Sequence, residues 1–322
     1  MTPRYVLRRL AQAVVTVVGV VVVAFVLIHL APGDAADTLS EGAASGDYAV
    51  QLRERMGLDR PLPEQLGTYV TQVLRGDLGD SSVQSGRSVA SLIGEHLPRT
   101  LLLMGPVVVL SSAVGVALAL RAAKKPNGAL DRATSVAALL GFGIPGFWLG
   151  QMAILVLALQ LRLFPVGGMT DVRVSPTGFD RVVDVGIHMS LPVLVLAAAE
   201  VAMVFRVTRA GILQERRKDY VRTAVAKGVP ADRALSHHAL RNALLPLATI
   251  LGARVAFLFS GTVLIERLFV WPGVGTLLIN ATAQRDRPLV VGIVLMVAFT
   301  LVSASLIADL VYARIDPRIR YD

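Results

Sequence analysis

Residues 10–30 of the chain read LAQAVVTVVGVVVVAFVLIHL and contain no Asp, Glu, Lys or Arg. A helix needs about 20 apolar residues to cross the roughly 30 Å hydrocarbon core of a bilayer, because a backbone in lipid must satisfy its own hydrogen bonds. The stretch therefore predicts a membrane-spanning helix. Its apolar run is longer than that of a secretory signal and no small-residue cleavage pattern follows, so we expect an uncleaved span.

Five further stretches meet the same criterion, and the composition agrees with them. Of the 322 residues, 54% are hydrophobic and only 17% are charged, whereas about a quarter of the residues in soluble domains are charged. No internal repeat or low-complexity linker divides the chain, so we expect a single all-α integral membrane domain over residues 1–322. Its six expected spans are Leu10–Leu30, Thr100–Leu120, Ala133–Leu161, Ile187–Phe205, Ala243–Leu264 and Leu289–Val311.

The third of these stretches is unusually long and carries Gly141, Gly143, Pro145 and Gly146. Proline has no backbone N–H, so the helix should kink or break at Pro145. Such a break within the membrane is tolerated only where protein or a cavity receives the freed carbonyl groups. We therefore expect a discontinuous third span.

The distribution of charge predicts the orientation of the chain. With the N-terminus inside, the cytoplasmic segments hold 19 basic and 6 acidic residues, whereas the outer segments hold 12 basic and 15 acidic residues. Lys and Arg accumulate in cytoplasmic loops, so we expect both termini and residues 206–245 in the cytoplasm and residues 31–99 outside. The net charge of +9 is typical of a membrane protein whose basic loops face anionic lipid. We therefore expect no nucleic-acid partner.

The long outer loop predicts two short helices, one near Tyr48–Met56 and one near Pro63–Leu74, each followed by a glycine. One face of the second helix is apolar, which favours packing on the membrane domain or its surface; docking of an external partner is the alternative. The residues of this face are Leu66, Tyr69, Val70, Val73 and Leu74.

The residue inventory argues against catalysis and metal binding by this chain. There is no Cys, so disulfides and thiolate metal sites are excluded. The five His residues are isolated, or adjacent and pointing to different sides of a helix, as at His237 and His238, so no metal site is expected. Phosphate-binding loops of the Gly-x-x-x-x-Gly-Lys-Ser/Thr type are missing as well. We expect no catalytic residue and no bound cofactor.

The cytoplasmic segment of residues 206–245 contains a short Ala-rich stretch, DYVRTAVAKG at residues 219–228, within a basic surrounding. A lipid-facing loop that merely turns at Gly228, Val229 and Pro230 would explain the charge. It would not explain a short helix between two turns. A stiff helix followed by a glycine turn is suited to sit in a partner's groove and to transmit a movement. We expect a second helical run over Asp232–Leu244.

The same segment resembles the EAA loop of ABC import permeases. It has Arg222-Thr223-Ala224, three further residues, Gly228, and Pro246 eighteen residues beyond the glycine. Arg222 and Thr223 replace the Glu and Ala of the general pattern. This form, followed by HALRNALLP at residues 238–246, resembles the peptide/nickel-type permeases. The resemblance implies a coupling helix that docks in a cleft of an ATPase subunit, formed by Asp219, Tyr220, Arg222, Thr223, Ala224, Lys227 and Gly228.

Other motifs extend the resemblance over nearly the whole chain. They are APGD at 31–34, GLDRP at 57–61, RGDLG at 75–79, IPGFW at 144–148, WPG at 271–273 and DPR at 316–318. The resemblance implies a type I ABC importer permease fold in the bacterial cytoplasmic (inner) membrane. It also implies a second permease subunit, different or identical, an extracytoplasmic solute-binding protein, and two ATPase subunits that hold ATP and Mg. Peptides are the expected cargo; nickel chelates, haem, glutathione and sugars are alternatives.

Three ionisable residues lie within expected spans, where a charge costs several kcal/mol unless it is paired or hydrated. One hypothesis pairs Glu200 with Arg254 beside the translocation path; the alternative places both near helix ends or against a partner subunit. Asp309 is close to the inner end of the last span, which favours a structural role.

An outer turn between the last two expected spans contains Glu266, Trp271, Pro272 and Gly273. Its position and the family resemblance suggest an extracytoplasmic gate. A rigid re-entrant turn without a gating role is the alternative.

Two other classes of protein compete with the importer. An ion-coupled secondary transporter would agree with a broken third span but would normally show internal repeats. An intramembrane enzyme would need a His-Glu-x-x-His pair, a Gly-x-Ser-x-Gly turn or a similar cluster, and the sequence has neither motif.

Overall fold

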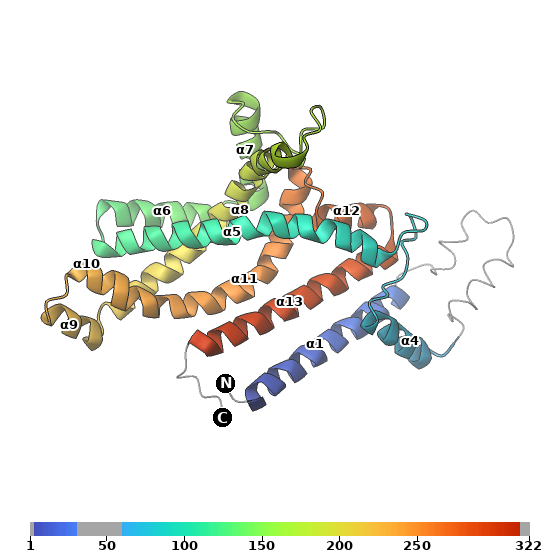
Figure 1. The fold of residues 1–322 in the computed structure, drawn as a ribbon, viewed down its shortest axis with the longest axis horizontal. Coiled ribbons are helices and arrows are strands. Elements are labelled where there is room, and N and C mark those ends of the chain that lie inside the picture. Colours follow the sequence, from blue (N-terminus) through green and yellow to red (C-terminus); the bar gives the residue numbers. More distant parts are fainter. Residues whose placement is uncertain (1–2, 31–59, 316–322) are drawn as a thin grey trace. The chain divides into compact units, whose positions relative to one another are not determined.

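The computed structural model describes residues 3–30 and 60–315, and it describes the side chains of 7–26 and 60–307 apart from 246, 248–258 and 260. The expected helix near Tyr48–Met56 lies outside these residues. Within the described residues the chain is a succession of helices (Figure 1), and the only extended pairing there is an isolated bridge between Asp80 and Ser88. The all-helical class expected from the sequence is confirmed.

The helices follow the chain in the order shown in Figure 1. Two π-helical segments, η1 and η2, continue the α-helices that precede them. The elements are α1 (Pro3–Leu30), α4 (Leu62–Leu74), α5 (Val89–Lys124), α6 (Ala129–Gly143), α7 (Gly146–Ala153), η1 (Ile154–Gln160), α8 (Gly178–Glu215), α9 (Asp219–Ala226), α10 (Ala231–Arg233), η2 (Ala234–Ala239), α11 (Leu240–Leu268), α12 (Val274–Ala283) and α13 (Arg287–Ile315).

Four of these helices contain a segment long and apolar enough to cross a membrane. They are α1, α5, α8 and α13, and a fifth crossing results if the bent pair formed by α6 and α7 with η1 is counted as one span. The remaining expected span falls in α11, which has 29 residues, but most side chains of residues 243–264 are outside the described set. The count of six spans, the orientation and the single-domain organisation therefore stay predictions.

The third expected span is broken where the sequence placed the break. Helix α6 ends at Gly143, Ile144 is extended, and Pro145 precedes the first residue of α7. The axes of the two halves differ by 102°. Proline at this position restricts the preceding residue to extended conformations and disrupts the helical hydrogen bonds, which is the physical reason for the break.

Helices α5 and α8 are longer than their expected spans. Helix α5 begins at Val89 rather than near Thr100, and α8 covers Gly178–Glu215 rather than Ile187–Phe205. A count of apolar residues identifies only the part of a helix that is apolar enough for the hydrocarbon core of a membrane. The polar turns at both ends continue the same helix, and the sequence gives little sign of them.

The contacts divide the chain into two compact units, which are described separately. In the unit formed by residues 2–97 and 277–306, α4 packs on α1 and α13 through a cluster that includes Val21, Ala24, Leu295 and Tyr69. The rings of Phe25 and Tyr69 lie 5.8 Å apart, and burial raises the pKa of the Tyr69 hydroxyl to about 12.

The apolar face expected for the second outer-loop helix is therefore partly confirmed. Tyr69, Val70 and Val73 are partly buried and pack against the cluster of Val21, Ala24 and Leu295, as predicted for a face that packs on the membrane domain. Leu74 departs from the prediction because it remains 78% exposed. Helix α4 ends immediately after it, at Arg75 and Gly76, so the chain turns away before that side chain can be covered.

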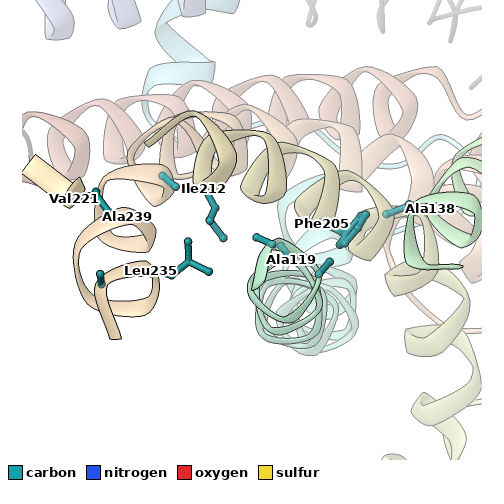
Figure 2. Packing of buried hydrophobic residues seen from close by; sticks show 12 residues of the cluster. Ala119, Ala138, Phe205, Ile212, Val221, Leu235 and Ala239 are labelled. Atoms are coloured by element: carbon teal, nitrogen blue, oxygen red, sulfur yellow. The ribbon is translucent and has the colours of Figure 1, made fainter. Parts of the chain in front are cut away.

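The other unit, formed mainly by residues 98–276 together with residues 307–322, contains a large cluster of buried side chains. Figure 2 shows Phe205 of α8 near Ala119 and Ala138, and Ile212 near Leu235 and Ala239. Most members of the cluster are alanines. Small side chains let helix backbones approach closely, and dispersion contacts then replace the hydrophobic drive that lipid does not supply.

A substitution at Gly211 tests this close packing. A Cβ added there would lie 3.1 Å from the Cβ of Ala243 on α11, so Gly211→Leu should force α8 and α11 apart. We expect a loss of about 1–3 kcal/mol, typical of overpacking, seen as a lower unfolding midpoint in detergent. Gly186→Leu on the same helix is the matched control, because a Cβ there meets nothing within 4 Å. Equal midpoints for the two variants would contradict the packing argument.

Candidate functional site

The short stretch at residues 219–228 forms the helix that the sequence predicts. Helix α9 starts after Lys218, whose backbone is extended, and Asp219 lies in its first turn, where a negative charge favours the helix dipole. The helix ends at Ala226 and its cap residue is Lys227; the next residue, Gly228, has a φ of 91°, which is accessible mainly to glycine. The amides of Gly228 and Val229 donate to the carbonyls of Val225 and Ala224. This is a Schellman motif, which fixes the end of the helix.

One side of α9 is anchored to the rest of its unit. Val221 is buried in the cluster with Ile212 and Leu235, and Figure 2 places it beside Ala239 of η2. The Tyr220 hydroxyl donates to Glu215 Oε2 at 2.5 Å and accepts a hydrogen bond from Asn242 Nδ2 at 2.8 Å. Burial, and then the hydrogen bond to Glu215, raise the pKa of the Tyr220 hydroxyl. The hydroxyl therefore stays protonated at neutral pH.

The opposite side of α9 is open to a partner. Arg222, Thr223, Val225 and Lys227 are exposed, and Val225 has an exposed fraction of 44%. Ala224 is half-buried and Gly228 is exposed at the turn. The predicted coupling residues thus lie on one short helix and on the turn that ends it. Tyr220 and its neighbour Val221 form the anchor, and the exposed side chains form the free surface.

Removal of the Tyr220 hydroxyl tests the anchor. Tyr220→Phe loses the hydrogen bonds to Glu215 and Asn242, each worth about 1 kcal/mol, so α9 should open more often. The two losses together amount to about 2 kcal/mol, so we expect amide hydrogen exchange in α9 to become roughly 30-fold faster. Lys227→Gln is the control, because its side chain is exposed and forms no hydrogen bond or ion pair with the described part of the chain. Unchanged exchange in Tyr220→Phe would show that the hydroxyl does not hold the helix.

An ion pair between α6 and α8, in which Asp131 is buried and the Arg209 side chain is 25% exposed, was not indicated by the sequence. Asp131, in the first turn of α6, is 2% exposed. Arg209 of α8 donates to both of its carboxylate oxygens, with Nε–Oδ1 and Nη2–Oδ2 distances of 2.5 and 2.6 Å. The Asn127 amide donates to Oδ2 at 2.8 Å. The two residues are 78 positions apart, so the only signal was that both fall in expected cytoplasmic segments.

The residues suggested for an outer gate are brought together at the end of α11. Glu266 is fully buried, and its carboxylate accepts hydrogen bonds from Thr100 Oγ1 at 2.7 Å and from the amides of Gly275 and Thr276 at 2.7 and 3.2 Å. A Cβ at Gly273 would collide with this carboxylate. Thr100 also belongs to this group of residues, although the sequence did not indicate it. The gating role stays a prediction.

Trp271 belongs to the same turn. Its ring is fully buried, and its Nε1–H donates to the Arg99 carbonyl at 3.0 Å. Pro272 is half-buried, and its carbonyl accepts a hydrogen bond from Arg99 at 3.4 Å. The turn is therefore fastened to the start of the unit's α5 segment through both the backbone and the side chain of Arg99.

Truncation of Glu266 tests the importance of this turn. Glu266→Ala leaves the buried donors of Thr100, Gly275 and Thr276 without their acceptor, at about 1–3 kcal/mol for each unsatisfied group. We expect a markedly lower unfolding midpoint and faster proteolysis within residues 269–276. Arg267→Ala is the control on the same helix, because Arg267 is exposed. A midpoint for Glu266→Ala equal to that of the control would contradict the assignment.

The remaining intramembrane residues are placed only in part. Glu200 lies within α8 and is partly buried. The side chain of Arg254 is outside the described set, so the pairing of Glu200 with Arg254 stays a prediction, as does the role of Asp309. Among the described residues, no three His, Cys, Asp or Glu side chains gather into a group that could hold a metal ion.

Comparison with known proteins decides the family. A family described as the binding-protein-dependent transport system inner membrane component matches residues 115–321. The N-terminal region of such membrane components matches residues 2–104. The chain belongs to this family. The resemblance to peptide/nickel-type permeases is thus confirmed, and with it the location in a bacterial inner membrane.

Individual relatives match this permease along almost its whole length. The oligopeptide transport system permease protein AppB of Bacillus subtilis is 36% identical over 317 residues, which cover 98% of this chain and 99% of the relative. The dipeptide transport system permease protein DppB of Escherichia coli K12 is 35% identical over 339 residues, covering 99% of each. A probable peptide ABC transporter permease protein, y4tP of Sinorhizobium fredii, is 36% identical over 317 residues, again with 98% and 99% coverage.

Proposed function

We propose that this permease forms half of the translocation pathway of an ATP-driven peptide importer, and that α9 couples it to an ATPase subunit. The names of the relatives support peptides as the cargo, because the three compared above are permeases of oligopeptide, dipeptide and peptide transport. The structure of α9 supports the coupling role, because α9 is a short helix with one anchored and one exposed side that ends in a glycine turn.

The two sides of α9 suit the transmission of a movement. Val221 and Tyr220 fasten it to α8, η2 and α11, so a force on the helix acts on those elements. The exposed side presents Arg222, Thr223 and Val225, a mixture of charge and small apolar surface that can enter a cleft. When the ATPase subunits close on ATP, α9 moves with them, and the attached helices move as rigid elements.

The proposed complex contains further subunits. Two ATPase subunits bind ATP and Mg and carry out the hydrolysis, while this chain binds no cofactor and performs no catalysis. A second permease subunit completes the pathway, and an extracytoplasmic solute-binding protein delivers the peptide. The family description supports the binding protein, because the system is described as binding-protein-dependent.

A bulky residue at Gly228 tests the coupling role. Gly228→Val must place a β-branched side chain at a φ of 91°, which costs about 1–3 kcal/mol, so the turn that fixes the end of α9 should change. We expect the assembled complex, reconstituted in proteoliposomes with its binding protein, to lose most ATP-driven uptake of a mixture of isotope-labelled di- to pentapeptides. Gly67→Ala in α4 is the control, because a Cβ there meets nothing within 4 Å.

The same assay separates the ways in which the proposal can fail. Normal ATP-driven uptake by a correctly assembled Gly228→Val complex would overturn the coupling role of α9. Uptake by the unmodified chain without ATPase subunits, driven by an ion gradient, would overturn the importer itself. Failure of the unmodified complex to accumulate any peptide of the mixture would overturn the cargo.

A further inference from the structure

The broken third span separates two differently packed helices within the unit of residues 98–276. Before the break, α6 lies along α8: Ala138 shares a buried cluster with Ala202 and Phe205, and a Cβ on Gly141 would make ordinary contact with Ala202. The guanidinium of Arg206 lies 5.6 Å from the centre of the Phe142 ring. Helix α6 is thus attached to the cytoplasmic half of α8 along its length.

After the break, α7 and η1 belong to a different cluster. Ala158 of η1 is buried with Leu191 and Val195 from the first half of α8 and with Ile265 and Phe269 from the end of α11. The contacts of the two halves of the third span therefore differ, and Ile144 and Pro145 lie between them. Hinges are short segments of this kind, at which two packed bodies meet.

The Asp131–Arg209 pair connects α6 to the element that leads into α9. Arg209 lies on α8 six residues before its last residue, Glu215, which accepts the Tyr220 hydrogen bond. Asp131 also accepts the Asn127 amide, so one carboxylate fixes the turn before α6 and joins that helix to α8. A guanidinium that donates two hydrogen bonds to one carboxylate restricts the relative orientation of the two side chains.

We propose that the Asp131–Arg209 pair is a positioning element that makes α6 move together with α8 and α9, so that a displacement of α9 reaches the break at Ile144 and Pro145. This inference rests on the proposed function of α9. Both partners are needed, because removal of Arg209 leaves the buried Asp131 carboxylate without its counter-charge, and removal of Asp131 leaves the partly exposed Arg209 without the acceptor that joins it to α6. The pair acts through helix position and contacts neither ATP nor peptide.

The test measures coupling rather than uptake alone. Asp131→Asn and Arg209→Gln are assayed in the reconstituted complex with the peptide mixture, and the number of ATP molecules hydrolysed per peptide imported is determined. We expect ATP hydrolysis to continue while this ratio rises about tenfold, in the range by which single residues alter coupling between sites. The charge exchange Asp131→Arg with Arg209→Asp should bring the ratio part of the way back.

An exposed ion pair provides the matched control. Lys124 and Asp232 also join two cytoplasmic segments, at 2.7 Å, but their side chains are 41% and 69% exposed. Such pairs contribute little to stability. Lys124→Gln should therefore leave the ratio of ATP to peptide unchanged.

A cross-linking experiment keeps the test decisive if the single variants assemble poorly. The chain has no Cys, so Asp131→Cys with Arg209→Cys can be bridged by a reducible bifunctional thiol reagent whose spacer replaces the two side chains. The bridged complex should regain tight coupling and lose it again on reduction, within one sample, with the reagent-treated unmodified complex as reference.

The outcomes distinguish this inference from the function on which it rests. An unchanged ratio in both single variants, or no difference between bridged and reduced complex, would overturn the role of the pair while the unmodified complex still couples normally. An unmodified complex in which ATP drives no uptake would overturn the proposed function instead.

Discussion

A backbone in hydrocarbon has no water to bond to, and the helical architecture of this permease depends on that constraint. Its N–H and C=O groups must be satisfied within the segment, so the described residues form helices, and four of them contain a stretch that can cross the membrane. The constraint also makes the break at Ile144 and Pro145 informative. One face of α6 and one face of α7 pack on other helices of the same unit, whereas Pro145 and Gly146 at the interruption itself are exposed within the described residues.

Three buried carboxylates accept hydrogen bonds from backbone N–H groups at helix ends, where the helix itself leaves these groups unpaired. Asp131 accepts the Asn127 amide just before α6, Glu266 accepts the amides of Gly275 and Thr276 in the first turn of α12, and Asp286 accepts the amide of Leu289 at the start of α13. Helix N-termini offer unpaired N–H groups and a partial positive charge. Each carboxylate meets that demand and at the same time binds a distant side chain: Arg209, Thr100 or Ser81.

Helix α9 and the break in the third expected span could be predicted, because the residues that specify them are close together in the sequence. The Ala-rich stretch, its glycine and the flanking turns specify α9 and the Schellman motif at Gly228 without help from the rest of the chain. The break at Pro145 follows from the chemistry of proline alone. The Asp131–Arg209 pair and the contact of Thr100 with Glu266 could not be predicted, because 78 and 166 residues separate the partners and nothing in either neighbourhood marks them as a pair.

The sequence by itself determined where the long apolar helices lie along the chain, where one of them breaks, and that a short helix closed by a glycine turn follows α8. These depend on hydropathy, proline and glycine, whose effects act within a few residues. Only the tertiary structure decided which side of α9 is anchored, how far α5 and α8 extend beyond their apolar cores, and which carboxylates fasten the helix ends. Those outcomes depend on close approach between helices remote in sequence, where small residues such as Gly211 and Ala243 set the distance.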